Sequence, residues 1–269
     1  MPVAVLDTNV IGVLTTRNQE LQDRAKSYLA DLRADGYAVA ITDGTALELA
    51  ANENAYTRQI TLNSAAMHCD GLLCSDADEI LKLEALDLVD HIPSLLLPLG
   101  DLQEIVESLH AQKSQAELRM RRRQKTLEVR QFKQWLDSHF KVAPNQVPPF
   151  SIFVRDCHLD FLQVYYDHHL AFLLHDRSFK TFDVIEDRLE PLWHRGKGWR
   201  IGVLNAMANV HRWATRELRK GEGSLSDAHV LVEAAYTDLF LTNDKELVGC
   251  GELINEVEPT PLIRAWPIG

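Results

Sequence analysis

Short apolar runs alternate with helical repeats in the first fifty residues. Residues 3–6 form an apolar run rich in β-branched side chains, and a second such run covers residues 37–41. Between them, apolar side chains recur at helical spacing over residues 17–34, and a glycine follows as a helix stop. The pattern predicts a strand, a helix and a second strand. A Thr-Asp-Gly turn comes next, and Thr45 is expected to cap the following helix.

The same alternation returns near residue 230. Residues 227–236 are expected to form a helix behind Ser226, and residues 239–241 form a short apolar strand. Thr242-Asn243-Asp244 ends that strand and begins another helix. Strands that alternate with helices favour an α/β fold with a mainly parallel sheet and right-handed crossovers.

The long middle of the chain differs from both ends. Residues 55–220 are predicted to be largely helical, with a clear break at the proline-rich stretch 143–149. We therefore expect a core made of residues 1–55 and 222–269. Residues 56–221 would then be a helical insertion that binds a substrate or a partner.

Four acidic residues stand at comparable places in the predicted α/β parts: Asp7, Glu48, Asp227 and Asp244. Each also has a local interpretation, as a turn residue, as half of a capping box with Thr45, or as an acid in a first helical turn. In parallel strands, however, all four can converge at one edge of the sheet. Four close carboxylates repel one another, and a divalent cation such as Mg²⁺ or Mn²⁺ removes that repulsion.

The residues around these acids resemble the PIN-domain ribonucleases. The matching motifs are Leu6-Asp7-Thr8-Asn9-Val10, Glu48 within Ala46-Leu47-Glu48-Leu49, Ser226-Asp227-Ala228 and Leu241-Thr242-Asn243-Asp244-Lys245. They cover residues 1–55 and 222–265. Glu53 is an alternative to Glu48 as the second acid. The long middle departs from the compact form of that family.

The resemblance implies an α/β/α sandwich with an acidic pocket at the strand ends, and Mg²⁺- or Mn²⁺-dependent cleavage of phosphodiester bonds, mostly in RNA. Asp7, Glu48, Asp227 and Asp244 would be the catalytic, metal-binding acids. Asn9 would orient the Asp7 carboxylate or a water on the metal, and Thr242 would act similarly beside Asp244. The expected protein is an endoribonuclease.

Charge adds a candidate surface for the nucleic acid. The chain carries a net charge of −11, which argues against a histone-like grip but not against a local basic groove. The densest basic run consists of Arg119, Arg121, Arg122, Arg123 and Lys125. A second basic stretch, residues 188–220, contains Trp193, Trp199 and Trp213. Tryptophans there could stack on the bases of single-stranded or loop RNA, or pack in the core, which is the interpretation we favour for Trp199 and Trp213.

Two other interpretations remain open. A haloacid-dehalogenase-like phosphatase would use Asp7 as a nucleophile, but it needs an acid two residues later, where this chain has Asn9. A catalytically inactive scaffold on the same fold would bind RNA or a partner without cleaving.

The remaining signals concern location and partners. The four cysteines form no metal or disulfide framework, no signal peptide is visible, and no apolar run approaches the ~18 residues of a membrane span. A cytoplasmic protein is expected. RNA is the expected partner. Single-stranded DNA, a homodimer and a protein inhibitor or antitoxin remain open alternatives.

Overall fold

The fold alternates strands and helices at both ends of the chain, as expected. A computed structural model describes residues 1–73, 77–86, 90, 96–98, 134, 147–173, 186–215 and 228–268. Its strands are β1 (Val3–Leu6), β2 (Ala38–Thr42), β3 (Gly71–Leu73), β4 (Leu96–Pro98), β5 (Leu239–Thr242) and β6 (Leu262–Ala265). Its helices are α1 (Thr8–Leu14), α2 (Gln19–Ala34), α3 (Asp43–Ala50), α4 (Ala55–His68), α5 (Ala77–Ala85), α8 (Phe150–Leu173), α9 (Glu186–Arg195), α10 (Lys197–Ala214), α12 (Ala228–Glu233) and α13 (Lys245–Asn255).

These strands form a sheet in the order β4-β3-β2-β1-β5-β6. β3, β2, β1, β5 and β6 run parallel, and β4 pairs antiparallel with β3 at one edge. The predicted mainly parallel sheet is confirmed. β3 and β4 were not predicted, because both are three residues long and lie in the stretch expected to be helical.

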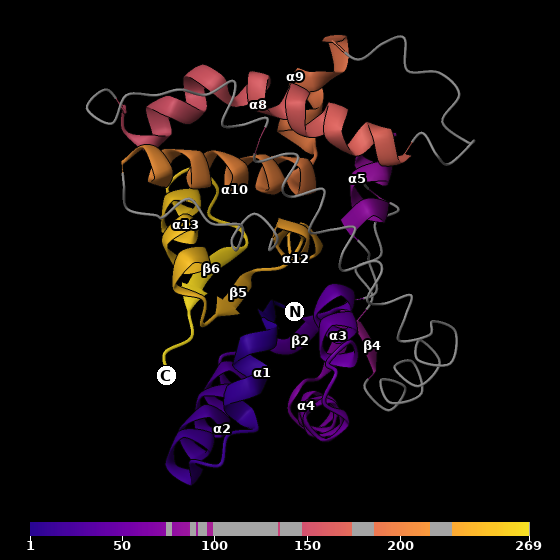
Figure 1. The fold of residues 1–269 in the computed structure, drawn as a ribbon, viewed down its shortest axis with the longest axis vertical. Coiled ribbons are helices and arrows are strands. Elements are labelled where there is room, and N and C mark those ends of the chain that lie inside the picture. Colours follow the sequence, from indigo (N-terminus) through magenta and orange to yellow (C-terminus); the bar gives the residue numbers. More distant parts are fainter. Residues whose placement is uncertain are drawn as a thin grey trace.

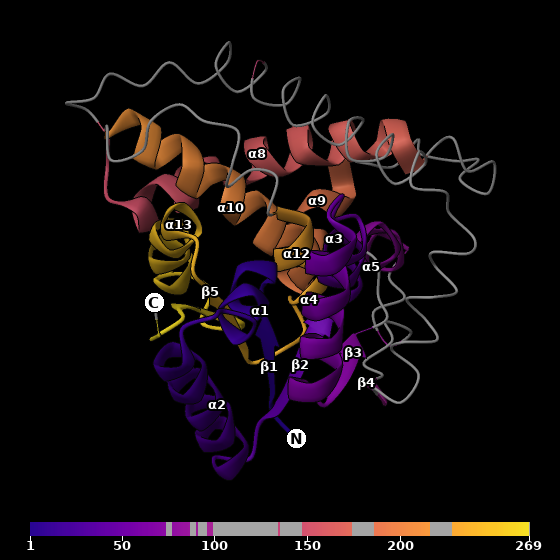
Figure 2. The same ribbon diagram turned by 60° about the horizontal axis from the view of Figure 1, so that its bottom comes forward.

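Helices cover both faces of the sheet, which gives three layers (Figures 1 and 2). Side chains of neighbouring strand residues point to opposite faces, as the pleat requires. Leu6 packs with α1 to α4 on one face, whereas Val5 packs with the helices on the other face. The second face is covered by helices α5, α8, α9, α10, α12 and α13. The α/β/α arrangement thus follows from strands that are apolar on both sides.

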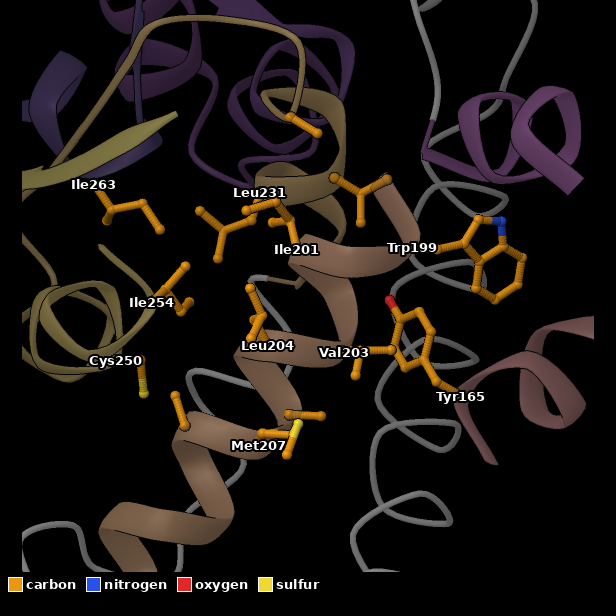
Figure 3. Close-up of a cluster of buried hydrophobic side chains, with 14 of the residues drawn as sticks. Tyr165, Trp199, Ile201, Val203, Leu204, Met207, Leu231, Cys250, Ile254 and Ile263 are labelled. Carbon is orange, nitrogen blue, oxygen red and sulfur yellow. The ribbon is translucent and has the colours of Figure 1, made fainter. Parts of the chain in front are cut away.

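Helix α10 is buried along most of its length. It packs against α8 on one side and against α12 and α13 on the other, and both ribbon views show α8 and α10 next to each other (Figures 1 and 2). The side chains around it come from several elements, including Tyr165, Leu231 and Ile254 (Figure 3). A helix enclosed in this way is expected to be mostly apolar, and α10 also buries the polar side chains of Asn205, Asn209 and His211.

A carboxylate from another helix caps α10. The residue before its first turn is Gly196, which has no side chain to accept the free N–H groups. Glu84 of α5 supplies the acceptors instead: Oε1 accepts from Gly198 N at 2.7 Å and Oε2 from Trp199 N at 3.0 Å. Glu84 is buried, so this tie between α5 and α10 lies inside the protein.

The tryptophans of the second basic stretch belong mostly to the core. Trp199 is fully buried, its indole N–H donates to Leu81 O at 2.8 Å, and Trp213 is buried as well. The core interpretation of these two residues is confirmed, so neither can stack on RNA bases. Trp193 is half-buried. Within the described residues, no helix has both the length and the apolar character needed to span a bilayer.

The order of the strands reverses beside β1. From β1 the chain moves through α1 and α2 to β2, and then through α3 and α4 to β3, always on one face. From β5 it moves through α13 to β6, in the opposite direction and on the other face. The connections thus leave the neighbouring strands β1 and β5 toward opposite faces of the sheet. In open α/β folds, ligands bind at such a reversal, outside the carboxyl ends of the strands.

Candidate functional site

The candidate site lies at this reversal, where the ends of β1 and β5 meet. Asp7 directly follows β1, and its backbone N–H donates to Leu241 O of β5 at 3.0 Å. Asp244 follows β5 two residues later. Each acid is also the N-cap of the helix that begins there, α1 for Asp7 and α13 for Asp244. Two predicted metal ligands therefore lie near the carboxyl ends of two neighbouring inner strands.

The Asp7 carboxylate is held by three donors. Its Oδ1 accepts from the backbone N–H of Thr8 at 2.7 Å. Its Oδ2 accepts from Asn9 Nδ2 at 2.7 Å and from the Thr242 hydroxyl at 2.6 Å. The expected contact of Asn9 with the Asp7 carboxylate is thus present. The side chain is fixed in one orientation from both strands.

Asn9 and Thr242 also join the two loops to each other. Asn9 Oδ1 accepts from the backbone N–H of Asn243 at 2.7 Å, and its Nδ2 lies 3.2 Å from the Thr242 hydroxyl oxygen. That oxygen accepts from the backbone N–H of Asp244 at 3.0 Å. Thr242 is fully buried. These bonds set the position of Asp244 relative to Asp7 across neighbouring strands.

Glu48 reaches this network through Thr8. The Thr8 hydroxyl donates to Glu48 Oε2 at 2.7 Å, which connects α3 to the start of α1. Glu53, the alternative second acid, lies beyond the end of α3 at Ala50 and so is not on the helix that carries Glu48. The structure favours Glu48 as the acid nearer to Asp7.

The start of α3 differs from the expected one. Thr42, not Thr45, is the N-cap, and its hydroxyl accepts from Thr45 N at 3.1 Å. The helix thus begins at Asp43, and Glu48 falls in its second turn. Glu48 is therefore not the return half of a capping box with Thr45. Its side chain is exposed, which leaves it available to a ligand.

The charges of the site act on one another. Burial raises the pKa of Asp7, the hydrogen bonds from Thr242 and Thr8 lower it, and the carboxylates of Glu48 and Asp244 raise it further. The pKa of Asp7 is raised in sum. A cation near these carboxylates would reverse the direction of that electrostatic effect.

One further buried acid supports the helix that carries Glu48. Glu233, the last residue of α12, accepts from the backbone N–H of Gly44 at 3.0 Å and so holds the first turn of α3. Sequence reasoning missed it, because nothing near Glu233 in the chain indicates a partner 189 residues away. The tie matters for the site, since α3 carries Glu48 and α12 begins directly after Asp227.

Whether these residues suit a divalent cation depends on donors and on arrangement. Carboxylate oxygens are the donors that Mg²⁺ and Mn²⁺ prefer. Among the described residues, however, no three His, Cys, Asp or Glu side chains are grouped closely enough to hold a metal ion. Asp227, the fourth predicted ligand, lies outside the described residues. The carboxylate donors suit such a cation, but the described residues do not by themselves form a metal site.

The predicted nucleic-acid surface also falls outside the described part of the chain. This applies to Arg119, Arg121, Arg122, Arg123 and Lys125 alike. In the second basic stretch, two arginines have internal roles: Arg200 pairs with the buried Glu258, and Arg212 donates to Glu246 O at 2.6 Å. These two guanidinium groups stabilise the packing of α10.

No protein-family model, no curated protein and no solved structure matches this chain.

Proposed function

We propose that this protein is a divalent-metal-dependent nuclease that hydrolyses phosphodiester bonds in RNA, with a PIN-like core. The observation that supports the proposal is the network at the strand-order reversal: Asp7, held by Asn9 and Thr242, beside Asp244 and Glu48. Ligand sites of open α/β sheets lie at such reversals, and this one presents carboxylates rather than a phosphate-binding glycine loop.

In this proposal, Asp7 and Asp244 hold one or two Mg²⁺ or Mn²⁺ ions, and Glu48 and Asp227 complete the ligand set. The cation would supply an activated water and positive charge against the scissile phosphate. Asn9 and Thr242 keep the Asp7 carboxylate in one orientation, which reduces the reorganisation that ligand binding requires. The basic residues 119–125 would contact the phosphates of the substrate.

The test is a cleavage panel. Labelled single- and double-stranded RNA and DNA are incubated with the full chain in Mg²⁺, in Mn²⁺ and in EDTA, with Asp7→Asn in parallel. We expect cleavage of single-stranded or loop RNA that needs the metal and falls at least a hundredfold in Asp7→Asn. Metal-independent turnover, or equal turnover by Asp7→Asn, would contradict the proposal.

The panel, extended by an RNA-binding assay and a small phosphate ester, separates the two rival functions. An inactive scaffold would bind RNA without cleaving it in any metal. A phosphatase would release inorganic phosphate from a small ester and leave an acyl-phosphate on Asp7. Against the phosphatase, the position two residues after Asp7 is Asn9, whose amide is already bonded to Asp7, Thr242 and Asn243 and which has no proton-donating carboxyl group.

A further inference from the structure

Thr8 contacts two of the proposed metal ligands at once. Its backbone N–H donates to Asp7 Oδ1 at 2.7 Å, and its hydroxyl donates to Glu48 Oε2 at 2.7 Å. It is the first residue of α1, whereas Glu48 lies in α3, 40 positions along the chain. A short side chain therefore bridges two acids that come from different elements.

Glu48 needs such a contact if it is to stay near Asp7. Its side chain is exposed, so solvent and several rotamers compete with any single position. The negative charges of Glu48 and Asp7 also repel, and this repulsion adds to the rise in the pKa of Asp7 that burial chiefly causes. The Thr8 hydroxyl opposes both the rotamer freedom of Glu48 and its repulsion from Asp7, because a hydrogen bond to an ionised acceptor is strong and directional.

The contact also gives the two carboxylate oxygens of Glu48 different roles. Oε2 accepts from Thr8, and none of the described hydrogen bonds involves Oε1. The backbone position of α3 is fixed independently, by the Thr42 cap and by Glu233. The position of helix α3 and the position of the Glu48 side chain thus depend on different contacts. Thr8 determines the position of the side chain.

We propose that Thr8 is a positioning residue of this site, which holds Glu48 beside Asp7 so that one carboxylate oxygen remains free for the cation. This inference rests on the proposed function. Thr8 itself binds neither metal nor substrate in this account. Loss of the Thr8 hydroxyl weakens metal binding, because the Glu48 side chain must then be ordered when the metal binds.

The experiment is a double-mutant cycle with Thr8→Val and Glu48→Ala in the full chain. Mn²⁺ affinity is measured by calorimetry, and thermal unfolding in EDTA is followed in parallel. We expect Thr8→Val to weaken Mn²⁺ binding about tenfold, in the range typical of residues that orient metal ligands, and Thr8→Ser to restore it. In the Glu48→Ala background, Thr8→Val should have no further effect.

Thr15→Val is the matched control. Thr15 lies at the other end of α1, and its hydroxyl donates to Gly12 O at 2.9 Å, so the variant loses a similar contact away from the acids. It should leave Mn²⁺ affinity unchanged. An unchanged affinity in Thr8→Val, or an equal loss with and without Glu48, overturns the role of Thr8 alone. Absence of Mn²⁺ binding by the unmodified chain overturns the proposed function and this inference with it.

Discussion

At the scale of single residues, the Asp7 carboxylate combines three hydrogen bonds with two nearby negative charges. The hydrogen bonds stabilise its ionised form, whereas burial and the neighbouring carboxylates oppose it, and the second group of effects dominates. In the proposed function, a cation bound beside Asp7 would offset these opposing effects.

This balance predicts that metal binding and stability are coupled through Asp7. Mn²⁺ at a hundred times its dissociation constant should stabilise the unmodified chain by about 2.7 kcal/mol, and Asp7→Asn should lose most of that gain. Urea unfolding with and without the ion measures both values. Asp156→Asn, which changes an exposed acid on α8, is the control and should keep the full gain. Equal gains in both variants would exclude Asp7 as a ligand.

Glu84 predicts a pH effect that is independent of the site. Burial raises its pKa, and the hydrogen bonds from Tyr236, Gly198 and Trp199 only partly lower it again. The folded protein therefore holds the Glu84 proton more tightly than the unfolded chain. Its contribution to stability is present below the unfolded pKa of about 4.3 and is lost as the pH rises through the folded pKa.

Glu84→Gln should remove this dependence. The variant loses one acceptor for the first turn of α10, so we expect it to be less stable than the unmodified chain at low pH. The difference should shrink as the pH rises above about 4.3, because only the unmodified chain loses the Glu84 contribution. Urea unfolding at a series of pH values measures the difference. Two parallel curves would show that Glu84 has an ordinary pKa.

At the scale of elements, the start of α3 depends on a close approach to α12. A Cβ atom added at Gly44 would lie 2.6 Å from Glu233 Oε2, closer than Cβ contacts allow, so the buried Glu233 carboxylate would have to move away from α3. Gly44→Ala should therefore destabilise the protein by ~1–3 kcal/mol, as overpacking does, and displace Glu48 with its helix.

Gly12→Ala is the control for this substitution. Gly12 lies within α1, and a Cβ atom there has no neighbour within 4 Å. Alanine is the better helix former by up to about 1 kcal/mol, so this variant should be neutral or more stable. Chemical denaturation of both variants measures the contrast. Equal losses at Gly12 and Gly44 would contradict the packing argument.

The same elements show what the sequence could predict. Strand β1 has the expected bounds, and α13 begins directly after Asp244, its N-cap, as expected, because the residues that define each element are adjacent in the chain. The start of α3 was misplaced by three residues, because the Glu233 contact that supports its first turn lies far away in the chain. Strand β3 has only three residues, too few to show a period, and its strand character comes from pairing with β2.

At the scale of the molecule, one sheet is shared by two apolar cores. Val5 and Phe240 belong to one core, and their neighbours Leu6 and Leu241 belong to the other. Neither core can lose its strands without exposing the other. We therefore expect the two faces to unfold together.

Two buried cysteines can test whether the two faces of the sheet unfold together. Cys69 belongs to the core between the sheet and helices α1 to α4. Cys250, a residue of α13, belongs to the core on the other face of the sheet. Thiol labelling at increasing urea, read residue by residue by mass spectrometry, should give one midpoint for both. The half-buried Cys157 should react at lower urea and marks native-state labelling. Separate midpoints for Cys69 and Cys250 would show that one face opens without the other.

The pairing of β1 with β5 has a consequence for the timing of activity. The hydrogen bond from Thr242 to Asp7 joins residues 235 positions apart. During synthesis, β1 therefore waits for its second neighbour until more than two hundred further residues have been made. The Asp7 carboxylate lacks its Thr242 partner throughout that interval. Under the proposed function, a nascent chain should hence be inactive toward RNA until β5 is in place.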